Sequence, residues 1–111
     1  MSVFRAISDP SRRRILDLLQ TQNLTAGVIA EHFPELSRPA VSKHLSILRK
    51  ARLVNARKRG REQVYMLNSE PLKEVAKWVN EYQQFWDRQL QSLKKFVEQQ
   101  ESSKPEEVND E

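Results

Sequence analysis

The hydrophobic residues of the chain recur at helical spacing over most of its length. Val3 to Ile7 is a short apolar segment, and Asp9-Pro10 then forms a typical helix start, with Asp as N-cap and Pro in the first turn. The helix that follows carries one apolar stripe, which consists of Ile15, Leu16, Leu18 and Leu19. Two helices are therefore expected before the polar break at Asn23.

Two further helices are predicted between Thr25 and Ala51. Thr25 is the N-cap candidate of the first, which ends at Phe33 because Pro34 follows. The residues of this helix that are expected to face inward are Val28, Ile29 and Phe33. Ser37 is the N-cap candidate of the second helix, which runs to about Ala51. Its apolar face, at i, i+4 and i+7, is formed by Val41, Leu45 and Leu48.

After Ala51 the pattern changes to that of strands. Leu53 to Arg57 and Gln63 to Leu67 are two short segments, the second rich in strand-forming residues. The segment between them, Lys58-Arg59-Gly60-Arg61, has a glycine where a turn needs positive φ. The sequence therefore predicts a β-hairpin with a cationic tip.

A long amphipathic helix is predicted from Glu70-Pro71 to roughly Gln100. Its apolar residues follow one another at steps of three or four: Leu72, Val75, Val79, Tyr82, Trp86, Leu90, Leu93 and Val97. This stripe is widened by Trp78, Phe85 and Phe96. One small core cannot cover so long a seam, whereas a second copy of the chain can. A homodimer is therefore expected, with an interface at Val3, Phe4, Ile7, Leu72, Val75, Val79, Tyr82, Trp86, Leu90 and Leu93.

These elements together predict a winged helix-turn-helix. The tight connection Pro34-Glu35-Leu36 is the turn, the helix after Ser37 is the recognition helix, and the hairpin is the wing. The expected fold is mainly α with a small β-hairpin, with five helices plus a two-stranded wing. We expect residues 1–100 to form one DNA-binding and dimerisation domain, and residues 101–111 to form a disordered acidic tail.

The basic residues are concentrated in the middle of the chain. Between Leu36 and Arg61 there are nine Lys or Arg residues and no Asp or Glu, although the whole chain has 19 basic and 15 acidic residues. A stretch of one sign indicates a polyanionic partner. Because this stretch coincides with the predicted recognition helix and wing, we expect the partner to be a double-stranded DNA operator.

The residues that contact DNA are expected on the polar face of the recognition helix and on the wing. The helix face carries Lys, Arg and Ser side chains, which bind base edges or phosphates in the major groove. The hairpin tip suits phosphate or minor-groove contact, and its charge also protects the hairpin from edge pairing. The candidates are Arg38, Pro39, Ser42, Lys43, His44, Ser46, Arg49, Arg57, Lys58, Arg59 and Arg61.

Three groups of residues have two interpretations each. His44 borders the apolar face, so it either contacts DNA or packs beneath its helix. Arg12 to Arg14 lie early in their helix, where cations oppose the helix dipole, so they are either exposed to solvent or bound to phosphate or an acidic partner. Trp78, Phe85 and Trp86 either belong to the dimer interface or line a ligand pocket within it.

The composition excludes several classes of site. The chain has no cysteine, which rules out disulfides, thiolate metal sites and cysteine nucleophiles. No apolar run approaches the ~20 residues of a membrane span, and the first residues lack the apolar core of a signal peptide. A cytoplasmic protein that does not contact membranes is therefore expected. Because no Gly-rich phosphate loop or catalytic Ser-His-carboxylate set is recognisable, neither an enzyme nor a cofactor is expected.

Several segments resemble the ArsR (arsenic-repressor-like) family of bacterial regulators. They are FRAISDPSRRRILDLL at 4–19, SRPAVSKHL at 37–45 and GREQVYMLN at 60–68. The last helix, with Trp78, Phe85-Trp86 and Leu90, is similar to a common branch of the family, and the resemblance covers about residues 3 to 97. It implies a homodimeric DNA-binding transcriptional regulator, usually a repressor, whose first and last helices form the dimer interface.

The chain departs from the founding members of that family at their metal sites. Those sites use Cys residues in the third helix or His and carboxylate ligands in the last helix, whereas the third helix here has no Cys and the last has no His. His32 and His44 lie in different helices without the spacing of a metal site, so no metal is expected. The alternatives are a metal-responsive repressor that uses His32 and carboxylates, and a winged-helix protein-interaction module that has lost DNA binding. The operator sequence, the regulated genes, the choice between repressor and activator, and a small-molecule or protein inducer are left open.

Overall fold

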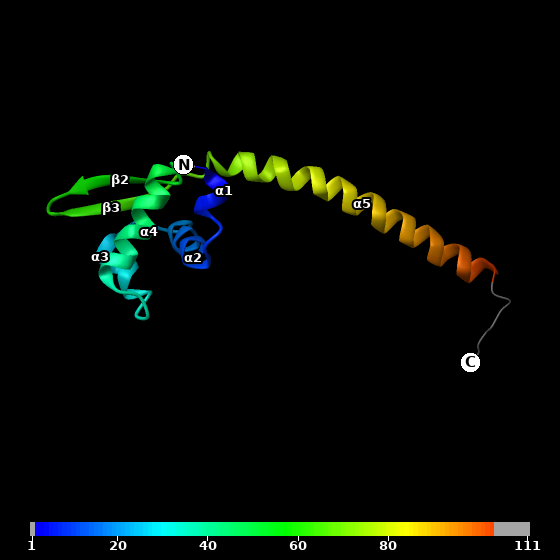
Figure 1. Ribbon diagram of the computed structural model, residues 1–111, viewed down its shortest axis with the longest axis horizontal. Helices are drawn as coiled ribbons and strands as arrows, with labels where there is room; N and C mark the ends of the chain where they lie inside the picture. Colours follow the sequence, from blue (N-terminus) through cyan, green and yellow to red (C-terminus); the bar gives the residue numbers. More distant parts are fainter. Residues whose placement is uncertain (1, 104–111) are drawn as a thin grey trace. The chain divides into compact units, whose positions relative to one another are not determined.

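The computed structural model describes residues 2–103. The elements of this range are α1 (Val3–Ala6), α2 (Pro10–Leu19), β1 (Leu24–Thr25), α3 (Ala26–Glu31), α4 (Arg38–Lys50), β2 (Val54–Arg59), β3 (Glu62–Leu67) and α5 (Leu72–Ser103) (Figure 1). The five predicted helices and the hairpin are thus confirmed. The chain divides within α5 into two compact units, one ending at Ala76 and the other starting at Lys77, and each is described by itself.

Three helices of the first unit begin at the N-caps that the sequence predicts. The Asp9 side chain accepts hydrogen bonds from the N–H groups of Ser11 and Arg12 at the start of α2. Thr25 caps α3 and Ser37 caps α4, each by accepting one N–H of the first turn. Because a capping side chain satisfies an N–H that has no partner within the helix, these residues determine where each helix starts.

The core of the first unit lies where α2, α3 and α4 pack against one another and against the sheet. The predicted inward faces are confirmed for five residues, which are buried: Ile29, Phe33, Val41, Leu45 and Leu48. Val28 was expected inside, but 37% of its surface is exposed. Since α3 has only six residues, it buries a narrow face around Ile29, and Val28 lies about 100° away around the helix.

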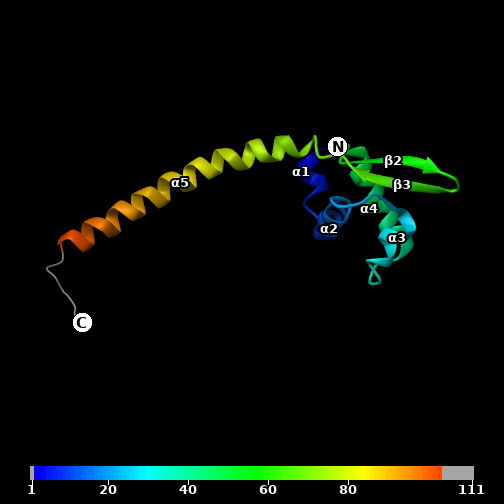
Figure 2. The ribbon, with the colours of Figure 1, turned by 180° about the vertical axis from the view of Figure 1, so that it is seen from behind.

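The sheet has three strands instead of the expected two. Its antiparallel order is β1-β3-β2, with Leu24 opposite Tyr65 and Thr25 opposite Val64. A two-residue strand is too short to show an alternating pattern, so only the pairing with β3 reveals β1. The hairpin of β2 and β3 extends from the helices of this unit (Figure 2).

The hairpin closes more tightly than the sequence suggests. Arg59 pairs with Glu62, which leaves Gly60-Arg61 as a two-residue loop. Gly60 has φ of 65° and is first in the loop, where a type II′ turn requires positive φ. The strands therefore carry the basic residues Arg57, Lys58 and Arg59 as far as the tip.

The end of α4 is a Schellman motif formed without glycine. The Leu53 N–H donates to the Leu48 carbonyl (3.0 Å) and the Arg52 N–H donates to the Arg49 carbonyl (2.9 Å). Arg52 takes the left-handed conformation that this motif requires, with φ of 65°. The side-chain amide of Asn68 donates to the Arg52 carbonyl (2.7 Å), which joins the helix end to the residue after β3.

The first residues of α5 belong to the first unit. Leu72 and Val75 are half-buried and pack against its core, and Val3 of α1 is buried in the same core. Beyond Ala76, α5 continues as a single helix to Ser103, three residues further than predicted. Positions 104–111 of the predicted acidic tail lie outside the described residues. Among residues 2–103, no helix is both long and apolar enough to span a membrane.

Candidate nucleic-acid interface

One face of α4 is buried and the other is polar and exposed. The Ser37 hydroxyl fixes the start of the helix by accepting the Ala40 N–H (3.2 Å), and the apolar residues of α4 then pack inward. The exposed face presents the predicted residues Arg38, Pro39, Ser42, Lys43, Ser46 and Arg49. Among the described acidic residues, none forms a salt bridge with this face. Its cations are therefore available to an external anion.

The turn before α4 is held by Arg14 of α2. The Arg14 guanidinium forms a salt bridge with Glu35 (3.1 Å) and lies over the Phe33 ring, 4.4 Å from its centre. Its second amino group donates to the His32 carbonyl (3.4 Å). The pKa of Glu35 lies below its ordinary value, because a hydrogen bond from its own backbone N–H stabilises the carboxylate more than desolvation destabilises it, and Arg14 lowers the pKa further. Arg14 thus connects α2 to the turn that orients α4.

Arg12 joins the end of α1 to the side of α4. Its Nε donates to the Ala6 carbonyl (2.6 Å) and its Nη2 donates to the Arg5 carbonyl (3.3 Å). The remaining amino group, Nη1, lies 3.1 Å from Nδ1 of His44. Arg12 therefore contacts α1 and α4 in addition to its own helix. Its contact on α4 is His44, at the edge of the polar face.

Arg12 bonds to carbonyl groups within the chain, a role that neither sequence interpretation included, whereas Arg14 has an acidic partner, as one of the two interpretations expected. Arg13 also bonds within the chain, since its Nη1 donates to the Ile7 carbonyl at the end of α1 (2.7 Å). The only acidic partner found for Arg12 to Arg14 among the described residues is Glu35. Carbonyl groups at the end of a helix need donors, and nothing in the sequence identifies which side chains supply them.

His44 is half-buried beside Arg12 and interacts electrostatically with Asp9. Partial burial raises the pKa of the Asp9 carboxyl, but hydrogen bonds from the Arg12 and Ser11 N–H groups and electrostatic interaction with His44 and Arg12 lower it more. The net pKa of Asp9 is below its ordinary value, so the N-cap stays ionised at neutral pH. His44 therefore borders both the interior and the polar face of α4.

The wing continues the basic surface. Arg57, Lys58, Arg59 and Arg61 are all exposed, as predicted. Three of them line a hollow beside the sheet, which is bounded by Asn23, Arg57, Lys58, Arg59, Val64 and Met66. The Arg49 guanidinium of α4 donates to the Gln63 side chain of β3 (3.5 Å), so the helix and the wing are in contact. Asn23 and Gln63 are neutral residues that the charge pattern could not single out.

The second unit carries aromatic residues but no cluster of metal ligands. Trp78 lies edge-on to Tyr82, with ring centres 5.2 Å apart, and Phe85 lies edge-on to Trp86 at 5.7 Å. Glu81 lies beside these rings, at the edge of a hollow lined by Trp78, Tyr82 and Phe85. Within the described part of the chain, no three His, Asp or Glu side chains lie close enough together to hold a metal ion.

Comparison with known proteins identifies relatives of this chain. Residues 9–56 match the family described as "Bacterial regulatory protein, arsR family". The chain is 46% identical over 78 residues to the "Transcriptional repressor SdpR" of Bacillus subtilis, which is 70% of this chain and 86% of that protein. It is 42% identical over 69 residues to the "Arsenical resistance operon repressor" of Staphylococcus xylosus, which is 62% of this chain and 65% of that protein.

The fold agrees with these relatives. The solved structure of an "ArsR-like Transcriptional Regulator from Rhodococcus sp. RHA1" matches with a TM-score of 0.63 and 35% identity, over 85% of this chain and 88% of that one. The relatives are transcriptional regulators, and the resemblance seen in the sequence is confirmed. The chain therefore belongs to the ArsR family of bacterial regulatory proteins, and it is a DNA-binding transcriptional regulator with a winged helix-turn-helix fold.

Proposed function

We propose that the protein is a repressor that binds a palindromic operator as a homodimer, in the cytoplasm. The observation that carries this proposal is the set of exposed basic residues on α4 and the wing, where the only acid from Arg38 to Leu67 is Glu62 at the start of β3. An α-helix fits the major groove, and its Lys, Arg and Ser side chains reach base edges there. Arg38, Ser42 and Lys43 would read bases, while the wing arginines would contact phosphates.

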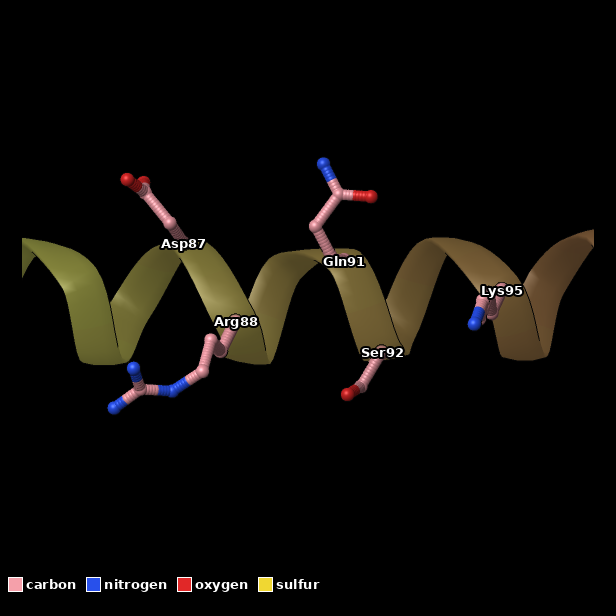
Figure 3. A pocket seen from close by; sticks show the side chains of 5 residues that line it. All are labelled: Asp87, Arg88, Gln91, Ser92 and Lys95. Carbon is pink, nitrogen blue, oxygen red and sulfur yellow. The ribbon is translucent and has the colours of Figure 1, made fainter.

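The dimer is supported by the exposed apolar stripe of α5. Trp86, Leu90 and Leu93 are 58%, 59% and 57% exposed, and they belong to one face of the helix. The other side of this segment is polar, and its side chains spread apart without converging on a site: Asp87, Arg88, Gln91, Ser92 and Lys95 (Figure 3). An apolar row of this length in water calls for a partner helix.

A second copy of the chain supplies a helix of the same length and pattern. We assign this interface to Val79, Tyr82, Trp86, Leu90 and Leu93 of α5. The half-buried residues Phe4 and Ile7 of α1 are also assigned to it. Val3, Leu72 and Val75 were also expected there. Val3 is buried in the core of its own unit, and Leu72 and Val75 are half-buried against that core, so these three residues have less surface to offer a second chain.

A two-fold dimer determines the form of the operator. Each α4 would occupy one half-site, and the half-sites would lie about one helical turn, roughly 34–36 Å, apart. Such a protein should select an inverted repeat from random double-stranded DNA. Selection followed by sequencing tests this, and enrichment of a single unrepeated half-site, or of no sequence at all, would contradict it. Repression is supported by the names of the relatives and is tested with a reporter gene placed behind the selected sequence.

A further inference from the structure

Arg12 lies where α1, α2 and α4 meet, and each nitrogen of its guanidinium is close to a hydrogen-bond partner. Two of the partners are carbonyl oxygens at the end of α1, at 2.6 and 3.3 Å. The third is Nδ1 of His44, at 3.1 Å. Both carbonyls can only accept, which fixes the plane of the guanidinium and therefore the direction of its third donor.

This contact determines where the proton of neutral His44 sits. A guanidinium has five N–H donors and no acceptor, so Nδ1 of His44 must accept from Arg12. The proton of the neutral ring must then be on Nε2, which points away from Arg12 on the other side of the ring. Among residues 2–103, no second hydrogen bond to the His44 ring is present besides that from Arg12. The half-buried ring thus has one N–H without a described acceptor, on the helix whose exposed face carries Arg38, Ser42 and Lys43.

We propose that Arg12 is a positioning residue of the DNA interface, which holds His44 with its proton on Nε2 so that this N–H donates to a phosphate oxygen of bound DNA. The proposal rests on the proposed function for the DNA contact, but the tautomer does not depend on it. Phosphate oxygens accept hydrogen bonds, and contacts of this kind fix the register of a protein on the duplex. These hydrogen bonds of Arg12, which we call the clamp, also connect the end of α1 to α4. A movement of α1 would therefore change the position of His44.

The chain contains its own reference for the tautomer. Nδ1 of His32 lies 3.1 Å from the Val28 carbonyl, which can only accept. Nδ1 of His32 must therefore carry a proton, the opposite of His44. Since the protein has two histidines, both are resolved in a single spectrum.

The first test measures the tautomers by long-range ¹H–¹⁵N correlation NMR of the whole protein without DNA. In mildly alkaline buffer, where histidine is ordinarily neutral, we expect the proton of His44 on Nε2 and that of His32 on Nδ1. Arg12→Met should turn His44 into a mixture of tautomers. The matched control is Arg13→Met, which loses the same charge and a bond to α1 but does not touch His44. A wild-type His44 protonated on Nδ1, or no change in Arg12→Met, would overturn the clamp.

The second test does not rely on the stability of the Arg12 variant. His44→Gln places an amide N–H near the position of Nε2, whereas His44→Asn reaches only as far as Nδ1. On DNA selected by the wild-type protein, His44→Gln should stay within about threefold of wild-type affinity and His44→Asn should lose about tenfold, as for one hydrogen bond to a charged group. Equal affinities of the two variants would overturn the role of His44. A wild-type protein that selects no DNA would overturn the proposed function itself, while the NMR result would still decide on the clamp.

Discussion

Arginine has three different roles in this chain, and its charge alone does not distinguish them. Arg12 and Arg14 bond inside the fold and connect α2 to its neighbours. Arg38 is exposed on α4, where an anion can reach it. Arg52 contributes mainly its backbone, in a left-handed conformation at the end of α4. The role of each follows from where the backbone puts it.

At Arg52 the left-handed conformation costs stability, so Arg52→Gly should stabilise the protein. A non-glycine residue in this region costs about 1–2 kcal/mol, and the greater entropy of glycine in the unfolded chain offsets part of the gain. We expect a net increase of about 0.5–1 kcal/mol in the free energy of unfolding, measured by urea denaturation at fixed protein concentration. Arg52→Ala, which keeps a Cβ, is the control, and a glycine variant no more stable than the alanine variant would contradict the argument.

Lys43 is the clearest candidate for reading a base, because it is exposed in the middle of the polar face of α4. Lys43→Ala should cost about 1–3 kcal/mol of affinity on the selected operator and less on random DNA. Fluorescence anisotropy on both DNAs measures the difference. The control is Lys73→Ala, which removes a lysine of α5 that pairs with Glu70, and it should change neither affinity. An equal loss of affinity on both DNAs would mean that Lys43 contacts the DNA backbone and does not read a base.

Among the elements, the hairpin of β2 and β3 holds its basic residues on a rigid backbone. Six residue pairs join its strands up to Arg59 and Glu62, and the third strand β1 pairs with the middle of β3, at Val64 and Tyr65. The two-residue loop leaves little freedom at the tip. The basic residues are therefore held in place, which lowers the entropy that DNA binding would otherwise cost.

If the wing contacts the DNA backbone, Arg59→Ala should weaken the binding of specific and random DNA alike. The log of affinity falls with the log of salt by about 0.9 per neutralised phosphate, so losing one contact should flatten the slope by about one. Titrations at several salt concentrations measure this slope. Arg88→Ala, on the polar side of α5, is the control with the same change of charge. A slope unchanged by Arg59→Ala would mean that the wing tip does not touch phosphates.

At the scale of the whole molecule, the two units differ in how they bury apolar surface. The first unit has a closed core of helices and sheet. The second consists of one helix, whose Trp86, Leu90 and Leu93 remain more than half exposed within the chain. A single helix cannot bury its own stripe, so the dimer is expected to contribute to stability as well as to operator recognition.

Trp86→Ala should therefore weaken the dimer. Large aromatic residues at the centre of an interface contribute about 2 kcal/mol or more when truncated, which corresponds to roughly a 30-fold higher dissociation constant. Sedimentation equilibrium over a range of concentrations gives this constant. Gln91→Ala, on the polar side of the same helix, should leave it unchanged. A wild-type protein that is monomeric at micromolar concentration would rule out the dimer.

Metal ions should not control DNA binding. The chain has no Cys, and its two histidines lie in different helices, so a zinc site has no set of ligands at suitable spacing. Anisotropy titrations in a chelator-treated background, with and without micromolar zinc, should give the same affinity. A tenfold loss with zinc, about 1.4 kcal/mol of coupling, would restore the metal-responsive alternative with His32 and carboxylates as ligands.

Elements whose causes are local could be predicted from the amino-acid sequence. Asp9, Thr25 and Ser37 cap helices because their side chains reach N–H groups two or three residues away. The apolar stripes of α2, α4 and α5 follow from helical periodicity, and the turn at Gly60 follows from its tolerance of positive φ. The exposed positions of the predicted basic residues on α4 follow from the same helical periodicity.

Features that depend on residues far apart in the chain became known only with the folded structure. Arg12 meets His44, Arg49 meets Gln63, and β1 exists as a strand because β3 pairs with it. Periodicity describes which face of an element is apolar, but it does not describe which element packs on that face or which polar groups meet there. Those contacts are decided when the core closes, because every buried carbonyl and side chain must then find a partner among the groups the fold has brought near.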